Sequence, residues 1–415
     1  MIKHNHKMMH SCLLSAIVDE HCFNYLPDET IIEIALYLPI SSIPHFSRVS
    51  HKFNKIICTN GYFWKQRFFQ DCGLINWIGS WSQLYQNCQN VWVCGHNNFN
   101  QLGINDTKDR IIPTLLYRRV KQVSAGGSHT HIIEINDNLY MFGLNPVDSS
   151  DMTWSTWPPI IKIKQVSAGY SHTILIDLEN NVLTVGDNHF GQLGLGDNQN
   201  RDRPILLSNF KAKHVSAGYY STAFIDLENN VWTFGNNPKG ILGLGDDCMR
   251  SRPQLISGLK AKMISTGTCN IGIIDLENNV WMTGDNFQIY PTLIPNIKAN
   301  DISIGSSHIV IVDLENNVWV FGSNQYGQLG LGHGQNMLVL TQIPNIKAKR
   351  ISAGSFHTII IDLENNVWTF GYNYYGELGL GHTQNRTVPT QIPNIKGWQI
   401  SAGRNCTMIV GTSIN

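Results

Sequence analysis

Apolar residues recur along the chain in short runs that end in glycine. One phrase, a strand-like run such as VWTFG, occurs seven times, and a second phrase, an apolar residue followed by Ser-x-Gly, also occurs seven times. Consecutive copies lie 38 to 49 residues apart, most often 49. A repeat of this length predicts an array of supersecondary units. The first phrase ends at Gly95, Gly143, Gly186, Gly235, Gly284, Gly322 and Gly371, and the serines of the second are Ser124, Ser167, Ser216, Ser265, Ser303, Ser352 and Ser401.

A hairpin is predicted between the two phrases. In the run from Ile174 to Val185, two apolar stretches flank Glu179-Asn180-Asn181, and asparagine tolerates the positive φ of a tight turn. Another short strand and a Pro-bearing turn precede the Ser-x-Gly phrase in several copies. Each unit therefore holds about four strands, as propeller blades do. The same DLENN turn, whose acidic side chains we expect to be solvated, begins again at Asp226, Asp275, Asp313 and Asp362.

The two ends of the array predict a closed ring rather than an open solenoid. The first run, at 91–95, has no Ser-x-Gly strand before it, and the last Ser-x-Gly strand, at 400–410, has no VWxFG run after it. Joining these halves completes one unit and removes the exposed sheet edges of an open array. We therefore predict an all-β, seven-bladed β-propeller over residues 91–415, closed by its N- and C-terminal strands.

Composition and charge limit the binding partners and the cellular compartment that we expect for this protein. The 30 Lys and Arg balance the 30 Asp and Glu, so no net field draws in nucleic acid or a membrane, and neither partner is expected. The nine cysteines form no C-x-x-C pair, which indicates reduced thiols. The longest apolar run near the start, LLSAIV at 13–18, is too short for a signal peptide or a membrane span. We expect a cytoplasmic or nuclear protein.

The first 23 residues contain His4, His6, His10 and Cys12, which suggest a metal site at first sight. Ordered zinc sites place paired ligands on a folded turn, and this segment has no such spacing. We predict a disordered tail at 1–23, with no metal.

The repeated phrases resemble the regulator-of-chromosome-condensation repeat family. The resemblance is carried by GQLGLG at 191–196 and 327–332, by VSAGYSHT at 166–173 and by the VWTFG runs, and it covers about three quarters of the chain. It implies a seven-bladed propeller that binds other molecules. Two units depart from the pattern, because the loops after Gly143 and Gly284 lack GQLGLG. Any family function that needs those loops is therefore in doubt.

A small helical domain is predicted at 24–70. Ile31, Ile34, Ala35 and Leu38 form one apolar helix stripe, which acidic residues and Pro39 bracket. The order LPDE…YLP…RVSHKFNKI…FWKQRF resembles an F-box, the module that docks on the Skp-type adaptor of cullin-RING ubiquitin ligases. The resemblance implies adaptor contacts, and we expect residues 71–90 to form a linker that packs this module against the propeller. The implied adaptor-binding residues are Leu26, Pro27, Ile31, Ile34, Leu38, Val49, Phe53 and Trp64.

The recurring Ser and His are candidates for a nucleophile and a base, as with Ser167 and His172. However, His recurs in the same column at 129, 308 and 357, and an active site is built only once. We therefore predict that these histidines donate hydrogen bonds between blades and that the tryptophans of the VWxFG runs pack within the blades. No catalytic residue and no cofactor are assigned, and the protein is predicted not to be an enzyme.

Loop residues that break the repeat are the candidate target-binding residues. Aromatic and Arg side chains on exposed loops are enriched at protein–protein hot spots. The candidates are Trp154, Trp157, Phe190, Arg201, Arg203, Arg250, Arg252, Tyr374, Tyr375 and Arg386.

These features give one leading hypothesis and one alternative. The domain order favours a substrate-recruiting F-box subunit of an SCF-type, cullin-RING ubiquitin ligase, with Skp-type adaptor, cullin and an unknown target as partners. The alternative is a guanine-nucleotide exchange factor, or a chromatin-associated regulator, of a Ran-type small GTPase. Near-identical repeats beside an F-box also resemble the expanded repeat proteins of large DNA viruses, which would place the protein in a host cell.

Overall fold

The computed structural model describes residues 90–116, 120–144, 151–156 and 161–413. The chain divides into two units, Met1–Cys88 and Gln89–Asn415, and all the described residues belong to the second. The predicted tail, F-box and linker at 1–23, 24–70 and 71–90 therefore lie outside the described residues, apart from Asn90. No helix among the described residues has the length and apolar character needed to cross a membrane.

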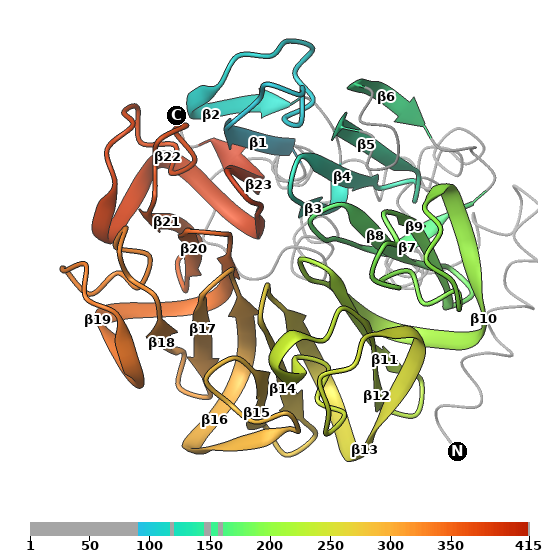
Figure 1. Cartoon of the computed structure of the whole chain (residues 1–415). Coiled ribbons are helices and arrows are strands. Elements are labelled where there is room, and N and C mark those ends of the chain that lie inside the picture. Colours follow the sequence, from blue (N-terminus) through green and yellow to red (C-terminus); the bar gives the residue numbers. More distant parts are fainter. Residues whose placement is uncertain (1–89, 117–119, 145–150, 157–160, 414–415) are drawn as a thin grey trace, which may run out of the picture. The chain divides into compact units, whose positions relative to one another are not determined.

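The second unit is a ring of antiparallel sheets around a central axis (Figure 1). In each blade the first strand is innermost and the fourth is outermost. Blade 1 consists of β3 (Val120–Ala125), β4 (His129–Glu134), β5 (Leu139–Leu144) and β6 (Asp151–Thr156). Blade 2 begins with β7 (Ile163–Ala168), β8 (His172–Asp177) and β9 (Asn181–Gly186).

Five long strands each serve two blades. The first part of β10 pairs with β9 as the outermost strand of blade 2, and its last part, from Ala212 to Ala217, pairs with β11 as the innermost strand of blade 3. The Pro-bearing segment expected to turn at 340–354 instead bends within one long strand, at Asn345, which has a positive φ and directly follows Pro344. The long strands are β10 (Arg201–Ala217), β13 (Arg250–Thr266), β16 (Thr292–Ile304), β19 (Met337–Ala353) and β22 (Arg386–Ala402).

The remaining strands occupy the second and third places of blades 3 to 6. They are β11 (Ser221–Asp226) and β12 (Asn230–Gly235), β14 (Asn270–Asp275) and β15 (Asn279–Gly284), β17 (His308–Asp313) and β18 (Asn317–Gly322), and β20 (His357–Asp362) and β21 (Asn366–Gly371). One short 3-10 helix, η2 (Pro238–Gly240), lies in a loop of blade 3.

Blade 7 joins the two ends of the propeller and confirms the predicted closure. It takes β22 and β23 (Cys406–Ser413) from the C-terminal end and β1 (Asn90–Gly95) and β2 (Arg110–Leu116) from the N-terminal end. β1 and β23 pair over six residues, from Asn90 opposite Gly411 to Gly95 opposite Cys406. The described strands thus complete seven four-stranded blades.

Apolar side chains of neighbouring blades form the core between them. Phe224 and Phe234 of blade 3, for example, pack with Ile174, Ile176 and Val182 of blade 2, and all five are fully buried. Trp232 packs against the same cluster, as predicted for the recurring tryptophans.

The DLENN turns differ from expectation, because their aspartates are largely buried rather than solvated. Asp226 is only 8% exposed, and its carboxylate accepts the backbone N–H groups of Glu228 and Asn230 as well as the indole N–H of Trp232. Burial alone would raise the pKa of Asp226, but these hydrogen bonds outweigh it and lower the pKa. The asparagine of the turn, Asn229, has the predicted positive φ, at 70°.

The alternation of strand direction gives the propeller two different faces. The connections from first to second strand and from third to fourth strand emerge on one face, here called the loop face. The DLENN hairpins, between second and third strands, emerge on the other, here called the hairpin face. The repeat-breaking loops thus share one face, whereas the near-identical turns share the other.

Because the ring closes where β1 meets the start of β23, we expect the stability of the protein to be sensitive to substitution of Gly95. Gly95 has φ +103°, and a Cβ there would lie 2.3 Å from the Asn405 carbonyl oxygen. Gly258 also has a positive φ, +78°, but a Cβ added there would have no atom within 4 Å. We expect Gly95→Ala to lower the free energy of unfolding by about 1–3 kcal/mol more than Gly258→Ala, because overpacking adds to backbone strain. Urea unfolding of both full-length variants measures the difference, and equal losses would contradict the closure geometry.

Candidate functional site

The serines of the Ser-x-Gly phrase bind each blade to the next. In every blade the Ser Oγ accepts a backbone N–H from the innermost strand of the following blade, at 2.9–3.0 Å. Ser167, for example, accepts the N–H of Ala217 at 2.9 Å. A hydroxyl placed identically seven times around the ring has a structural role. The prediction that Ser167 is not a nucleophile agrees with this contact.

The recurring histidines also connect blades, as predicted. His172 Nε2 lies 2.8 Å from Thr222 Oγ1, and this hydroxyl donates in turn to the Gln192 carbonyl at 2.7 Å. The imidazole is therefore the donor to Thr222. Equivalent contacts join His308 to Thr358 and His357 to Thr407, each at 3.0 Å, and His129 to Thr173, at 3.3 Å.

Burial keeps these imidazoles neutral. It lowers the pKa of His172 and His308 to about 3 and that of His129 and His357 to about 4. Neutral, fully buried imidazoles that bond to threonines of the framework are poor candidates for acid–base catalysis.

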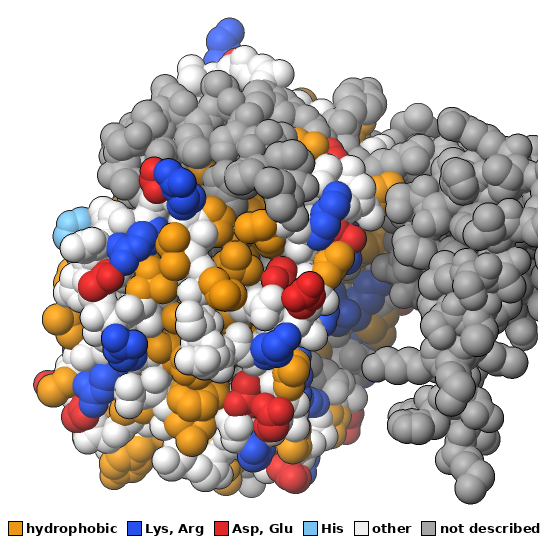
Figure 2. All heavy atoms as spheres, turned by 90° about the vertical axis from the view of Figure 1, so that its right-hand side faces the viewer, with side chains coloured by type: hydrophobic (Ala, Val, Ile, Leu, Met, Phe, Trp, Pro, Cys, Tyr) orange, Lys and Arg blue, Asp and Glu red, His pale blue; other side chains and the backbone are white. Residues whose placement is uncertain are grey.

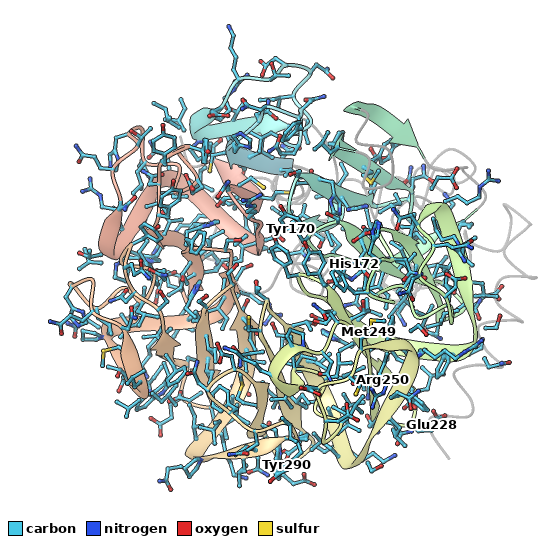
Figure 3. The ribbon with its side chains drawn as sticks, in the orientation of Figure 1. Tyr170, His172, Glu228, Met249, Arg250 and Tyr290 are labelled. Atoms are coloured by element: carbon cyan, nitrogen blue, oxygen red, sulfur yellow. The ribbon has the colours of Figure 1, made fainter. Side chains whose placement is uncertain are left out.

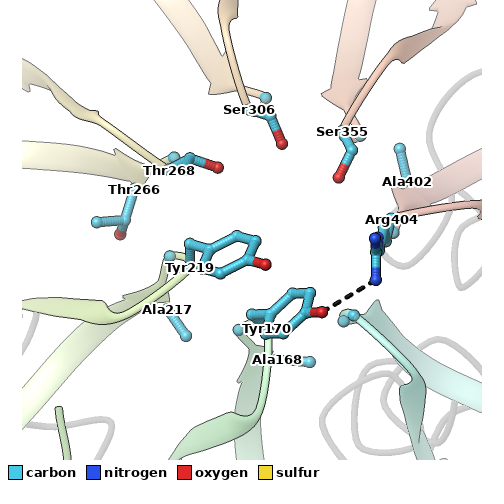
Figure 4. A pocket seen from close by; sticks show the side chains of 18 of the residues that line it. Ala168, Tyr170, Ala217, Tyr219, Thr266, Thr268, Ser306, Ser355, Ala402 and Arg404 are labelled. Atoms are coloured by element: carbon cyan, nitrogen blue, oxygen red, sulfur yellow. Dashed lines mark hydrogen bonds between the residues drawn. The ribbon is translucent and has the colours of Figure 1, made fainter. Parts of the chain in front are cut away.

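The residue after the glycine of each Ser-x-Gly phrase lines the axis, where segments from all seven blades surround an open pocket of about 100 Å³ (Figure 4). We call these seven residues, one from each blade, the axial column. Their side chains differ in size from blade to blade: small side chains line one half of the pocket and large ones line the other. The members of the column are Gly127, Tyr170, Tyr219, Thr268, Ser306, Ser355 and Arg404.

Arg404 and two tyrosines form the large half of the column. The Tyr170 and Tyr219 rings stack with their centroids 3.9 Å apart. Arg404 Nη1 donates to the Tyr170 hydroxyl at 2.9 Å, and its guanidinium carbon lies 5.4 Å from the centre of the same ring (Figure 4). Such a contact combines a hydrogen bond with cation–π attraction.

Gly127 allows this contact across an intervening blade. Arg404 belongs to blade 7 and Tyr170 to blade 2, and the corresponding residue of blade 1, which lies between these blades, is Gly127. A Cβ at Gly127 would lie 2.4 Å from the Tyr170 carbonyl oxygen and 2.8 Å from its ring. The missing side chain in blade 1 is thus part of the site.

Two further rings extend this group over the loop face. Tyr220 lies 4.5 Å from Tyr219 between ring centroids, and Phe190 lies 4.9 Å from Tyr220. Phe190, a predicted target-binding residue, therefore joins the axial residues. We call Tyr170, Tyr219, Tyr220, Phe190 and Arg404 the axial cluster.

A second aromatic group covers the loops of blades 5 to 7. Tyr375 lies 4.5 Å from His96, and Tyr374, which is 65% exposed, lies 5.0 Å from Tyr375. Both tyrosines are predicted target-binding residues, and the structure brings them together. Glu377 lies buried beside them, and this burial raises its pKa to about 7. We call this group the outer cluster; its members are His96, Tyr326, Phe356, Tyr372, Tyr374 and Tyr375.

Three of the predicted arginines bind within their own loops. Arg201 pairs with Asp197 at 2.6 Å and Arg250 with Asp246 at 2.5 Å, whereas Arg386 contacts His382 at 2.7 Å. Figure 3 places Tyr170 near the axis and Arg250 farther out. These contacts hold the loops in shape and occupy the guanidinium groups.

The other predicted target-binding residues are dispersed. Arg203 and Arg252 are exposed on the outermost strands of blades 2 and 3. Trp154 lies in β6, where side chains are not described, and Trp157 and all the predicted adaptor-binding residues lie outside the described residues. Whether any of these residues binds a target stays a prediction.

Tyr170, Tyr219 and Arg404 were not predicted as site residues from the sequence. A signal for them was present, because the residue after Ser-x-Gly varies among Gly, Tyr, Thr, Ser and Arg between otherwise similar phrases. Only the convergence of all seven loops at the axis shows that this variable column forms one surface.

Two family models match the propeller unit. The regulator of chromosome condensation (RCC1) repeat matches residues 90–133, 179–225, 228–269, 315–361 and 364–410, together more than half of the chain. The chain belongs to the RCC1 repeat family. A second RCC1 repeat model matches 163–192, 212–241, 300–328 and 348–377 of this RCC1-repeat protein. An F-box-like model matches residues 23–70, which confirms the predicted module.

Solved structures confirm the fold of the RCC1-repeat protein. Human WBSCR16 matches with a TM-score of 0.70 and 17% identity, over 79% of this chain and 99% of that one. Prp20p from Saccharomyces cerevisiae, which is described together with its binding to Gsp1p and histones, matches with a TM-score of 0.70 and 17% identity, over 81% and 96% of the two chains. Among curated protein sequences, none matches at a significant level.

The buried histidines predict acid sensitivity of this RCC1-repeat propeller. An imidazole whose pKa falls from about 6.5 when unfolded to about 3 when folded costs stability as the pH drops below about 6.5, by about 1.4 kcal/mol per pH unit. We expect His172→Asn to reduce the slope of the unfolding free energy against pH by the equivalent of one proton between pH 6 and 5. Asparagine is chosen because Asn270 occupies the corresponding position in blade 4. The double variant with His308→Asn should reduce the slope by the equivalent of two protons. Urea titrations at each pH measure the slopes, and slopes equal to that of the parent would refute the buried, neutral state.

Proposed function

We propose that this protein is a substrate-recruiting subunit of a cullin-RING ubiquitin ligase. In this proposal, the F-box-like segment at 23–70 binds a Skp-type adaptor, and the propeller presents its loop face to a target protein. RCC1 repeats and F-box-like domains are binding and adaptor modules. Ubiquitin transfer would therefore take place on the partner proteins, in the cytoplasm or nucleus.

The contrast between the two faces of the propeller is the observation that carries the proposal. The hairpin face repeats one turn, DLENN, in five blades, whereas the loop face concentrates the aromatic residues and Arg404 in two clusters. Tyr and Arg are among the residue types most enriched at hot spots of protein interfaces. The axial cluster offers stacked rings and a positive charge, which suit an acidic or aromatic side chain of a target.

Charge supports a protein target rather than nucleic acid. The net charge is zero, and Figure 2 shows positive and negative side chains interspersed with apolar ones on the side of the propeller that it presents. Nucleic-acid binding relies on an extended positive surface that neutralises phosphates.

A second proposal is the exchange of guanine nucleotides on a Ran-type small GTPase, or chromatin association. It is supported by the fold shared with Prp20p, for which binding to Gsp1p and histones is described. At 17% identity, this likeness concerns the fold alone. The F-box-like segment is the feature that favours the ligase proposal over it.

Capture from cell lysate tests the ligase proposal. We expect the full-length chain to recover the Skp-type adaptor and cullin, and Leu26→Ala/Pro27→Ala to lose both, because these residues begin the F-box-like segment. The matched control is Tyr219→Ala/Arg404→Ala, which should keep the adaptor and lose target proteins.

Two outcomes would contradict the proposal. Absence of adaptor and cullin with the unaltered chain would remove the ligase function. Equal recovery of the adaptor by the Leu26→Ala/Pro27→Ala variant would mean that it binds elsewhere. In the first case, nucleotide exchange on a Ran-type GTPase becomes the next assay.

A further inference from the structure

The connection between the third and fourth strands of blade 4 is too short to pack against the next blade, as the corresponding loops of five other blades do. In five blades the connection between third and fourth strands includes a leucine that is completely buried. In blade 4, between β15 and β16, the connection is only the short run DNFQIYP at 285–291. The buried leucines of these five blades are Leu102, Leu193, Leu242, Leu329 and Leu378.

The loop of blade 2 shows what this leucine and its neighbours do. The Leu193 carbonyl accepts the Thr184 hydroxyl at 2.9 Å. The next residue, Gly194, packs so tightly on Phe234 of blade 3 that a Cβ there would lie 2.8 Å from the ring. Two residues on, the Gly196 N–H donates to the Ser251 carbonyl in the outermost strand of blade 3, at 2.7 Å.

The same bond to the next blade recurs elsewhere in the ring. Blade 5 donates from Gly332 to the Thr387 carbonyl, and blade 6 from Gly381 to the Ile111 carbonyl, both at 2.8 Å. Leu338 of blade 5 corresponds to Ser251 of blade 3 and Thr387 of blade 6. In each of these blades, the last glycine of the third strand pairs with a residue of the fourth strand, and the residue named here directly follows it. The loop of blade 4 that would reach Leu338 is the one that is shortened.

An apolar cavity of about 190 Å³ lies at this place, between blades 4 and 5. Phe287 of the short connection covers part of it, with its ring 5.7 Å from that of Phe321. Phe321 stands where Phe234 stands in blade 3, directly before the last glycine of the third strand. The other lining residues are also apolar: Met282, Ile294, Ile309, Ile311, Leu338 and Leu340.

The rim of the cavity includes Leu338, which at 81% is the most exposed large hydrophobic residue among those described. The next residue in β19, Val339, is 66% exposed. An apolar cavity bordered by an exposed apolar side chain has the features of a ligand-binding groove. We call the cavity and this rim the blade 4–5 notch.

We infer that the blade 4–5 notch binds a linear peptide of a partner protein, through a leucine that takes the place of the missing loop. The leucine fills the cavity, the following residue is glycine because it lies against Phe321, and a backbone N–H farther along donates to the Leu338 carbonyl. The cavity is large enough, because an apolar cavity of about 150 Å³ already holds a benzene-sized group. The five equivalent leucines of this chain supply the chemistry of the ligand. The inference does not depend on adaptor binding.

A peptide copied from blade 2 tests this directly. The probe is a fluorescently labelled GQLGLGD, the sequence of residues 191–197, titrated with the purified full-length chain and followed by polarisation. We expect saturable binding at one site. Peptides in which the first leucine becomes alanine, or the glycine after it becomes valine, should bind roughly tenfold more weakly or worse, because the first loses buried apolar area and the second clashes with Phe321.

Two variants of the chain locate the site. Leu338→Glu places a charge on a rim residue that is 81% exposed, so we expect it to leave folding intact and to weaken binding by about tenfold or more. The matched control, Thr387→Glu, changes the residue at the same register in blade 6, where the loop of blade 5 is present, and should bind like the parent. Circular dichroism confirms that both variants fold.

The inference is overturned by absence of binding to the full-length chain, or by equal binding to the parent and Leu338→Glu. It is also overturned if the chain forms a dimer in sedimentation experiments that Leu338→Glu abolishes, since a second copy would then occupy the notch.

Discussion

The hydrogen bond from a backbone N–H to the serine hydroxyl of the preceding blade is the constraint on which the propeller depends. It recurs at all seven blade junctions with almost the same length, so each serine must stand at the same height and angle around the axis. The glycine two residues on is fixed by the same close approach. At Gly169, for example, a Cβ would lie 2.4 Å from the Gly218 carbonyl oxygen of the next blade.

This constraint separates positions that must repeat from positions that are free to differ. Ser167 is held by a contact between blades that recurs at all seven junctions, and His172 is held by a contact that recurs at His129, His308 and His357. Tyr170 lies between them in sequence, but its side chain projects towards the axis and makes none of these framework contacts (Figure 4). Because backbone groups and small side chains hold the framework together, residues as different as Thr268 and Arg404 occur in the axial column, whereas the Tyr170 carbonyl oxygen leaves no room for a side chain at Gly127. The asymmetry of the loop face follows from this freedom.

The sequence predicted the elements whose signals are local or repeated. Closure through blade 7 followed from the incomplete repeats at the two ends, and the positive φ of Asn229 followed from the turn that it occupies. The burial of Asp226 was missed, because the indole of Trp232 that covers it lies six residues away and its direction is set by the fold. The same reason limits site prediction. His96 and Tyr375 meet only because closure brings blades 6 and 7 together.

The predicted arginines illustrate a further limit. Arg201 and Arg250 break the repeat in a way that suggests recognition, yet each is paired with an aspartate four residues before it. Sequence alone does not distinguish a guanidinium that shapes its own loop from one that is available to a partner. A missing segment is equally hard to interpret from the sequence. The connection of blade 4 is visibly shorter than the others, but only the structure shows that a cavity lies beside Phe321 as a result.

The proposed function requires that targets bind the loop face and not the hairpin face. Photo-crosslinking in cells tests this most directly, with a photoreactive phenylalanine analogue placed at Tyr219 on the loop face or at Leu227 on the hairpin face, which is 43% exposed. We expect a target adduct from position 219 and none from position 227. An adduct from position 227 alone would contradict the proposal.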